Sequence, residues 1–254
     1  MKIVNHSKMP AVVYELLKVD MYDFTPNKDK ISATQLLKPV QEHILTQRHY
    51  AEIEIDAIDR IWAIFGSGIH KVFEASKLAD YQEQRIAVDI EGKTISGKFD
   101  MILKNRLIDL KVISAWSIVF GSREDDWRKQ LSIYRWLYWK ETGKLLPESA
   151  VKLDDTGYIL AICRDFDKKR VGGKNYPELP ILEIPVKLLS IEDTEKAVIG
   201  KIKMIKEAEG MTDEMLPECT DEQRWWSAKD KVYRRCQKYC PAFKFCSQAQ
   251  AKGE

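Results

Sequence analysis

The sequence predicts an α/β fold, in which a central mixed β-sheet is flanked by helices and a small cysteine-rich appendage follows at the C-terminus. Three observations support this prediction. Helical periodicity near the N-terminus gives way to three consecutive strand-like segments, and a helix, two strands and another helix come after them. Four of the five cysteines lie beyond residue 218. We therefore expect one domain over residues 1–212, with an N-terminal helical region, and a separate tail over residues 213–254.

The segment before the strands is predicted to be helical. Ser32 and Gln35 stand at the spacing of a capping box, so a helix begins there, and Pro39 should interrupt it. Residues 57–81 carry apolar side chains at helical spacing. They predict a second helix with one apolar face.

The middle of the chain reads as strands and a buried helix. Alternating apolar residues predict strands at 85–90, 94–103 and 106–113, separated by short turns. The next segment, "DDWRKQLSIYRWLYWKETG", is apolar almost all round and predicts a buried helix, N-capped by Asp125 or Asp126 and ended by Gly143. Further strands are expected within residues 156–166 and 179–186, and a helix over residues 190–210.

Composition excludes some classes of protein. The chain has 254 residues, 31% of them charged, and a net charge of only +2, so any surface for nucleic acid must be local. No apolar run is long enough for a membrane span, and the N-terminus lacks the features of a secretion signal. These features predict a cytoplasmic protein without a membrane partner.

Two acids stand inside predicted strands. If Lys104 and Asn105 form a two-residue turn, Asp100 lies directly opposite Asp109, and Lys111 shares the face of Asp109. Paired carboxylates repel unless a cation lies between them. The pattern predicts a divalent-metal site beside a cationic group. From this segment alone, an ordinary surface ion pair is the commoner interpretation.

Four motifs together resemble the PD-(D/E)XK nuclease superfamily and its RecB-like branch. "GKFD" ends at Asp100, "DLK" (109–111) stands as the (D/E)XK element, "QLSIY" (130–134) matches QxxxY, and "GSGIH" (66–70) resembles GxxxH. Two departures are Phe99 where the family has Pro, and Asp in place of the commoner Glu at the start of "DLK". The resemblance implies a restriction-endonuclease-like core and cleavage of DNA with Mg²⁺ or Mn²⁺.

The resemblance also assigns roles to residues. Lys111 would orient the attacking water or stabilise developing charge, and Gln130 and Tyr134, one helical turn apart, would place the scissile phosphate. Glu83 matches a frequent family acid, or is a solvated helix end. The implied ligands of the active-site metal are His70, Asp100, Asp109 and the carbonyl oxygen of Leu110, with Glu83 as an additional candidate.

The cysteine-rich tail predicts a structural metal. The triplet Cys236, Cys240 and Cys246 resembles the C-terminal iron–sulfur triplet of RecB-like and CRISPR-associated nucleases. Those relatives commonly take a fourth ligand from an N-terminal helix, whereas here Cys219 is the natural substitute. Four thiolates suit either Zn²⁺ or a [4Fe–4S] cluster. Free buried thiols are the alternative.

The tail is also basic and aromatic. Arg234, Arg235, Trp225 and Trp226 suit phosphate contacts and base stacking, although an ordinary solvated helix face is an equal interpretation. A second basic stretch, "RDFDKKRVGGKNY" (164–176), predicts a flexible loop that lines a DNA channel.

These features favour a metal-dependent DNA exonuclease that works from the ends of linear DNA. The chain leaves little room for dedicated elements that read base edges, and the resemblance to the RecB-like branch implies processing of DNA ends, for example in phage or prophage recombination. Two alternatives stay open. One is a DNA-binding accessory protein with a non-catalytic nuclease-like core. The other is a CRISPR-adaptation nuclease, and each pathway would add protein partners. The sequence does not indicate an oligomeric state.

Overall fold

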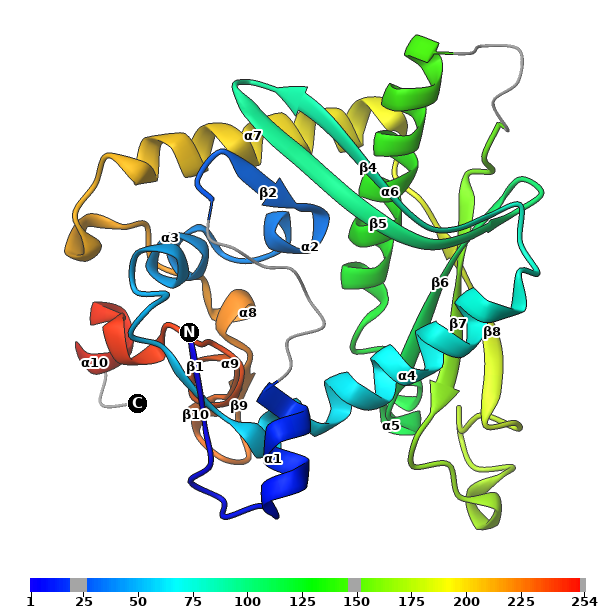
Figure 1. Ribbon diagram of the computed structural model, residues 1–254, viewed down its shortest axis with the longest axis horizontal. Helices are drawn as coiled ribbons and strands as arrows, with labels where there is room; N and C mark the ends of the chain where they lie inside the picture. Colours follow the sequence, from blue (N-terminus) through cyan, green and yellow to red (C-terminus); the bar gives the residue numbers. More distant parts are fainter. Residues whose placement is uncertain (19–26, 146–151, 252–254) are drawn as a thin grey trace. The chain divides into compact units, whose positions relative to one another are not determined.

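The computed structural model describes residues 1–18, 27–145 and 152–251 (Figure 1). The chain forms two compact units. We call residues 32–37 and 63–198 the sheet unit, and residues 1–31, 38–62 and 199–254 the cysteine unit.

The sheet unit is built on a mixed β-sheet. Its strands β5 and β6 form a hairpin, β6 runs parallel to β7, β8 is antiparallel to β7, and β4 is antiparallel to β5. Side chains alternate between buried and half-buried along β7, so one face of this strand is covered more deeply than the other. The bounds of these strands are β4 Tyr81–Ile90, β5 Lys93–Leu103, β6 Arg106–Ile113, β7 Thr156–Cys163 and β8 Ile181–Lys187.

The hairpin has the register that its turn predicts. Leu103 pairs with Arg106, and Met101 pairs with Ile108. The regular ladder stops there, one residue pair before Asp100 and Asp109 would meet. The two acids therefore lie where β5 and β6 cease to exchange backbone hydrogen bonds.

Helix α6 (Glu124–Leu145) packs on the sheet, and its middle, residues 130–138, is buried all round as predicted, while most of its first six residues are exposed. Its bounds differ from the prediction, because it begins before Asp125 and Asp126 and continues past Gly143. The acids lie in its first turn, where carboxylates complement the helix dipole. Gly143 lies in open space within the helix, so nothing forces the helix to end there.

Two further helices in this region begin as the sequence predicts. Helix α2 (Ala33–Leu36) has the complete Ser32–Gln35 capping box. Helix α4 (Ile61–Ser76) follows a 3₁₀ turn, η1 (Ala57–Arg60), and places Phe65 and Val72 at 54% and 70% exposure. The apolar side chains predicted for one face of this helix are present, and no described residue of the helix is buried.

The cysteine unit has small sheets and short helices. Strands β1 and β3 pair in parallel, and β9 and β10 pair antiparallel. Helix α7 begins in the sheet unit and ends in this one.

The remaining elements of the chain, from both units, have the following bounds: β1 Lys2–Val4, α1 Ala11–Lys18, β2 Lys30–Ser32, α3 Val40–Arg48, β3 Glu54–Asp56, α5 Ala115–Val119, η2 Lys168–Arg170, α7 Ile191–Glu209, η3 Asp213–Met215, α8 Asp221–Arg224, β9 Trp226–Ser227, β10 Val232–Tyr233, α9 Arg234–Lys238, η4 Phe243–Phe245 and α10 Ser247–Ala251.

The fold class predicted from the sequence is confirmed: a central mixed sheet flanked by helices. The tail after residue 212 belongs to the same compact unit as the N-terminal residues. The domain boundary between residues 212 and 213 depends on the cysteine-rich sequence of the tail, and it stays a prediction. Within the described ranges, every helix is too short or too polar to cross a membrane.

Candidate active site

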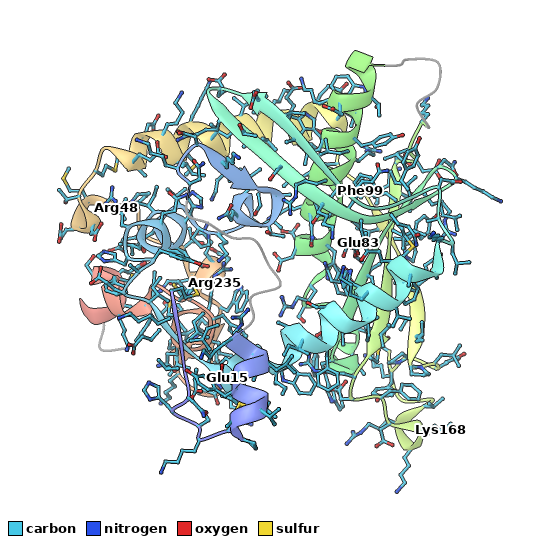
Figure 2. The ribbon with its side chains drawn as sticks, viewed as in Figure 1. Glu15, Arg48, Glu83, Phe99, Lys168 and Arg235 are labelled. Carbon is cyan, nitrogen blue, oxygen red and sulfur yellow. The ribbon has the colours of Figure 1, made fainter. Side chains whose placement is uncertain are left out.

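Three carboxylates form a row across adjacent strands of the sheet unit. The β4–β5 register places Glu83 opposite Asp100, and the β5–β6 register, extended by one pair, brings Asp109 into the same row. The labels of Glu83 and Phe99 mark this part of the sheet in Figure 2. Three acids in line are mutually repulsive unless cations compensate them.

His70 of α4 meets two of these acids. Its Nδ1 atom lies 3.2 Å from Glu83 Oε1 and 3.4 Å from Asp100 Oδ1. One potential ligand atom from each of the three residues falls within a mutual distance of 4.8 Å. The imidazole is 30% exposed and the carboxylates are 12% and 11% exposed, so the group is open to solvent on the histidine side.

Asp100 is the most strongly perturbed acid of the row. Burial raises the pKa of its carboxyl well above the ordinary value, and the charge of Asp109 raises that pKa further. Lys111 and a hydrogen bond from the Leu110 backbone amide to Asp100 Oδ2, 2.6 Å long, oppose the shift. Without further positive charge, the folded chain disfavours ionised Asp100.

Asp109 has partners of its own on β6 and on helix α6. Its Oδ2 atom lies 2.6 Å from Lys111 Nζ, and its Oδ1 atom accepts a 3.5 Å hydrogen bond from Gln130 Nε2. The same amide donates to Tyr134 Oη at 2.9 Å. Gln130 and Tyr134 lie one turn apart on α6, so the helix presents both side chains toward β6.

Glu83 shows two features that the sequence did not reveal. Its backbone has a φ of +52°, a left-handed conformation that is uncommon outside glycine and costs about 1–2 kcal/mol. Its carboxylate also forms an ion pair with Lys98 of β5. Strained backbone of this kind concentrates at functional sites. Period-two alternation puts Lys98 on the same face of β5 as Asp100, and this was the signal that could have placed Lys98 at the site.

The structure brings the predicted active-site residues into one region, in two groups. His70, Glu83 and Asp100 form the first group, and Asp109, Lys111, Gln130 and Tyr134 form the second. Leu110 contributes its amide to Asp100, and the role of its carbonyl oxygen as a ligand stays a prediction.

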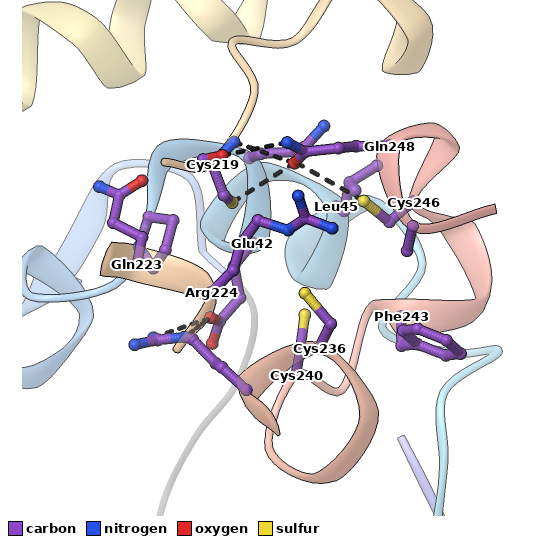
Figure 3. Close-up of a pocket in the computed structure, with 14 residues that line it drawn as sticks. Glu42, Leu45, Cys219, Gln223, Arg224, Cys236, Cys240, Phe243, Cys246 and Gln248 are labelled. Atoms are coloured by element: carbon purple, nitrogen blue, oxygen red, sulfur yellow. Dashed lines mark hydrogen bonds and ion pairs between the residues drawn. The ribbon is translucent and has the colours of Figure 1, made fainter. Parts of the chain in front are cut away.

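The four predicted cysteines line one pocket of the cysteine unit (Figure 3). Burial raises the pKa values of the Cys219 and Cys240 thiols to about 12, with neighbouring thiols and Glu42 adding to the effect. Gln41 Oε1 accepts weak hydrogen bonds from Cys219 Sγ at 3.5 Å and Cys246 Sγ at 3.6 Å. In the described chain no three of the cysteine sulfurs approach one another within 4.8 Å.

Helix α3 supplies the wall of this pocket, which sequence reasoning missed. Glu42 is only 4% exposed and pairs with Arg235 at 2.8 Å. The contact joins residues 193 positions apart. The one sequence signal was a run of polar residues in α3 that proves to be buried, including Gln41 and His43.

The predicted DNA-binding residues of the tail differ in their surroundings. Arg235 is engaged by buried Glu42 and lies 5.1 Å from the Trp225 ring centroid, so it serves an internal contact. Arg234 pairs with Asp230 at 2.6 Å on the surface, and Trp226 is 53% exposed. Their contact with DNA stays a prediction.

Comparison with known proteins gives a fold and no family assignment. No model of a protein family matches the chain, and no curated protein matches it. The solved structure of SSO0001 is similar at a TM-score of 0.55 and 18% identity, over 94% of this chain and 95% of that one.

Two other solved structures overlap less well. An alkaline exonuclease from Laribacter hongkongensis gives a TM-score of 0.37 at 13% identity, over 70% of this chain and 89% of that one. A phage-related exonuclease from Haemophilus somnus gives 0.31 at 15% identity, over 77% and 82%. The chain thus shares its fold with SSO0001, while the likeness to the exonucleases is too low to establish a shared fold.

Proposed function

We propose that this chain is a divalent-metal-dependent DNA exonuclease that hydrolyses phosphodiester bonds from DNA ends. One observation carries the proposal: His70, Glu83 and Asp100 converge beside a second group formed by Asp109 and Lys111. Each of these three residues offers one ligand atom within 4.8 Å of the other two, an arrangement that a single metal ion can use.

The residues of the first group fit Mg²⁺ or Mn²⁺. Carboxylate oxygens are the ligands that these hard cations prefer, and an imidazole suits Mn²⁺. Buried Asp100, whose charge the folded chain disfavours, gains most from a cation. His70, Asp100 and Asp109 would hold the metal, with Glu83 and the Leu110 carbonyl oxygen as further ligands, and the bound ion would supply a more acidic water and neutralise phosphate charge.

The second group acts on the phosphate and the water. Lys111 is 28% exposed, so its ammonium can reach a phosphate while Asp109 holds its position. It would stabilise the charge that develops in the transition state. Gln130, fixed by its bond to Tyr134 Oη, would orient the scissile group.

The proposal also includes a preference for DNA ends. The motifs of residues 66–134 resemble the RecB-like branch, and a role in phage or prophage recombination follows from that resemblance. All five cysteines are free thiols, in keeping with a reducing cytoplasm as the proposed compartment.

The test compares closed circular DNA with the same DNA linearised, each with Mg²⁺, Mn²⁺ or EDTA. We expect the linear form alone to be degraded, and only with metal. Discrete cutting of the circle would refute end dependence, and binding without cleavage in either metal would favour a DNA-binding accessory protein.

We also propose a structural metal centre at the four cysteines. Buried thiols with raised pKa values ionise only when a cation replaces their protons. Four cysteine sulfurs at one pocket suit either tetrahedral Zn²⁺ or a [4Fe–4S] cluster, so both metals stay in the proposal.

Anaerobic purification tests this second proposal. We expect one metal centre, lost in Cys236→Ser, with Cys163→Ser as the control because Cys163 lies on β7 of the sheet unit. Iron with absorption near 400 nm would identify a [4Fe–4S] cluster, and zinc by elemental analysis would identify the other metal. A folded protein without either metal would overturn the proposal.

A further inference from the structure

A cavity of about 330 Å³ opens where β6 and β7 end in the sheet unit. Because these strands are parallel, their C-terminal ends meet at one edge, and the segments that follow them pack together. The cavity is lined by Trp116 and Val119 of α5, by Tyr176, and by residues of the loop 169–174. No role in the proposed active site uses this cavity.

One wall of the cavity continues into an aromatic shelf. The rings of Trp116 and Phe120 stack with centroids 5.9 Å apart and planes at 21°. Tyr176 meets Trp116 edge-on at 6.0 Å. Phe120 is 72% exposed and Trp116 is 39% exposed, so aromatic surface of the shelf is accessible to solvent.

The other wall is cationic. Residues 164–174 contain five Lys or Arg and two Asp. Asp165 accepts from Ser114 Oγ and the Ala115 amide, and Asp167 accepts from the Lys169 amide and pairs with Arg170 at 3.4 Å. The loop keeps an excess of positive charge, and its lysine side chains are exposed to solvent.

The loop is tied down. The Asp167 amide donates to Tyr176 Oη at 2.8 Å, and Tyr176 itself is 8% exposed and packs with Ala115 and Cys163. The sequence predicted a flexible loop, whereas these contacts hold its cations beside the shelf. Groups held in place lose less entropy when a ligand binds.

The cavity lies close to the proposed active site along the chain. Trp116 follows Lys111 by five residues, so their Cα atoms are separated by at most about 18 Å. A strand bound at the shelf can therefore reach Lys111 over a few nucleotides. A guanidinium group already lies over an aromatic ring here, since Arg170 Cζ is 5.1 Å from the centroid of the Trp116 ring.

We propose that this aromatic and cationic cavity binds single-stranded DNA. Bases stack on Trp116 and Phe120, and phosphates lie against Lys169 and Lys174. Duplex DNA keeps its bases stacked on one another, so only an unpaired strand can use the shelf. The bound strand is the one whose end the active site cleaves, and this last clause alone rests on the proposed function.

Binding is measured by fluorescence anisotropy of a labelled oligothymidylate on protein made cleavage-inactive by Asp109→Asn. In that background, Trp116→Ala and Phe120→Ala are each expected to weaken binding about 5- to 100-fold, the range for the loss of one stacking side chain. Trp139→Ala is the matched control: Trp139 is 49% exposed and has Lys140 Nζ 5.2 Å from its ring centroid. It should bind like the parent.

Salt dependence tests the cationic wall. Replacing Lys169 and Lys174 by Ala should lower the slope of log affinity against log salt by about 0.7 for each cation removed. Lys196→Ala, an exposed lysine on α7, should leave the slope unchanged.

Four outcomes decide between the proposals. Shelf variants that bind like Trp139→Ala overturn the single-strand site, and so does an equal loss of affinity for blunt duplex DNA. A parent enzyme that cleaves no DNA overturns the proposed function, while the affinities still decide this inference. Weakened binding to single strands alone supports it.

Discussion

Lys111 Nζ lies 2.6 Å from Asp109 Oδ2, and the two residues stand two positions apart on β6. The side chain of Lys111 is 28% exposed and that of Asp109 is 3% exposed. The acid is thus fixed in the protein, and the cation is the member of the pair that an incoming phosphate can meet.

Replacing Lys111 by Ala is expected to reduce DNA cleavage about 10²- to 10³-fold, the usual effect of removing one group that stabilises transition-state charge. The fold should persist, because Asp109 keeps its hydrogen bond from Gln130. Single-turnover cleavage of linear DNA measures the effect. Lys71→Ala removes an exposed lysine next to His70 in the sequence and should cleave at the parental rate. Equal rates for the two variants would remove Lys111 from the site.

Replacing Asp100 by Asn is expected to raise the free energy of unfolding in EDTA. Burial and the charge of Asp109 both disfavour the ionised carboxyl, and the Asn carbonyl can still accept from the Leu110 amide. Adding Mg²⁺ should stabilise the parent more than the variant, since a ligand of the native state shifts unfolding. Thermal unfolding in EDTA and in Mg²⁺ measures both effects: the higher stability of the variant without metal, and the larger stabilisation of the parent by metal. Asp89→Asn, an exposed acid on β4, should show neither change.

Gly97→Ala is expected to destabilise the sheet unit by about 1–3 kcal/mol, as overpacking does. A Cβ atom there would lie 2.7 Å from Leu137 Cδ1 and 2.9 Å from Tyr134 Cδ1. Because Tyr134 must move, its bond to Gln130 and the cleavage rate should suffer as well. Gly143→Ala on α6 meets nothing within 4 Å and should be neutral or slightly stabilising. Denaturant unfolding together with cleavage rates would show whether Gly97 matters.

Stability should also depend on pH through His49 and Asp213 of the cysteine unit. Burial lowers the pKa of His49, but hydrogen bonds to Asp213 and Glu52 outweigh it, so that the pKa is raised above 6.5. The stabilisation is complete below pH 6.5 and is lost as pH rises through the folded-state pKa. The hydrogen bond from His49 lowers the pKa of Asp213 below 3.8, so that contribution is lost only as pH falls below this value.

Unfolding free energies measured from pH 5 to pH 9 should therefore decline above pH 6.5, by no more than about 1 kcal/mol for a pair this exposed. The His49→Gln variant should lack the decline. An identical pH profile for parent and variant would show that this pair contributes nothing measurable.

The positions of most elements could be predicted because their signals are local. Period-two alternation marks β4 to β6, and the turn at Lys104 and Asn105 fixes the register that brings Asp100 near Asp109. The motif residues His70, Gln130 and Tyr134 could be named from their spacing by resemblance. Helix ends were predicted less well. Gly143 was expected to end α6, but the helix continues past it, because nothing around Gly143 requires the helix to end there.

The sequence by itself determined the strands, the buried character of α6 and the pairing of Asp109 with Lys111, since each depends on residues a few positions apart. The resemblance already implied that His70 and Asp100, with Glu83 as a candidate, share one metal, but only the tertiary structure decided the distances between these side chains. It also decided that Glu42 pairs with Arg235 in the cysteine pocket. These contacts join residues 13, 30 and 193 positions apart, and packing of whole elements sets such distances. Local periodicity carries no information on them.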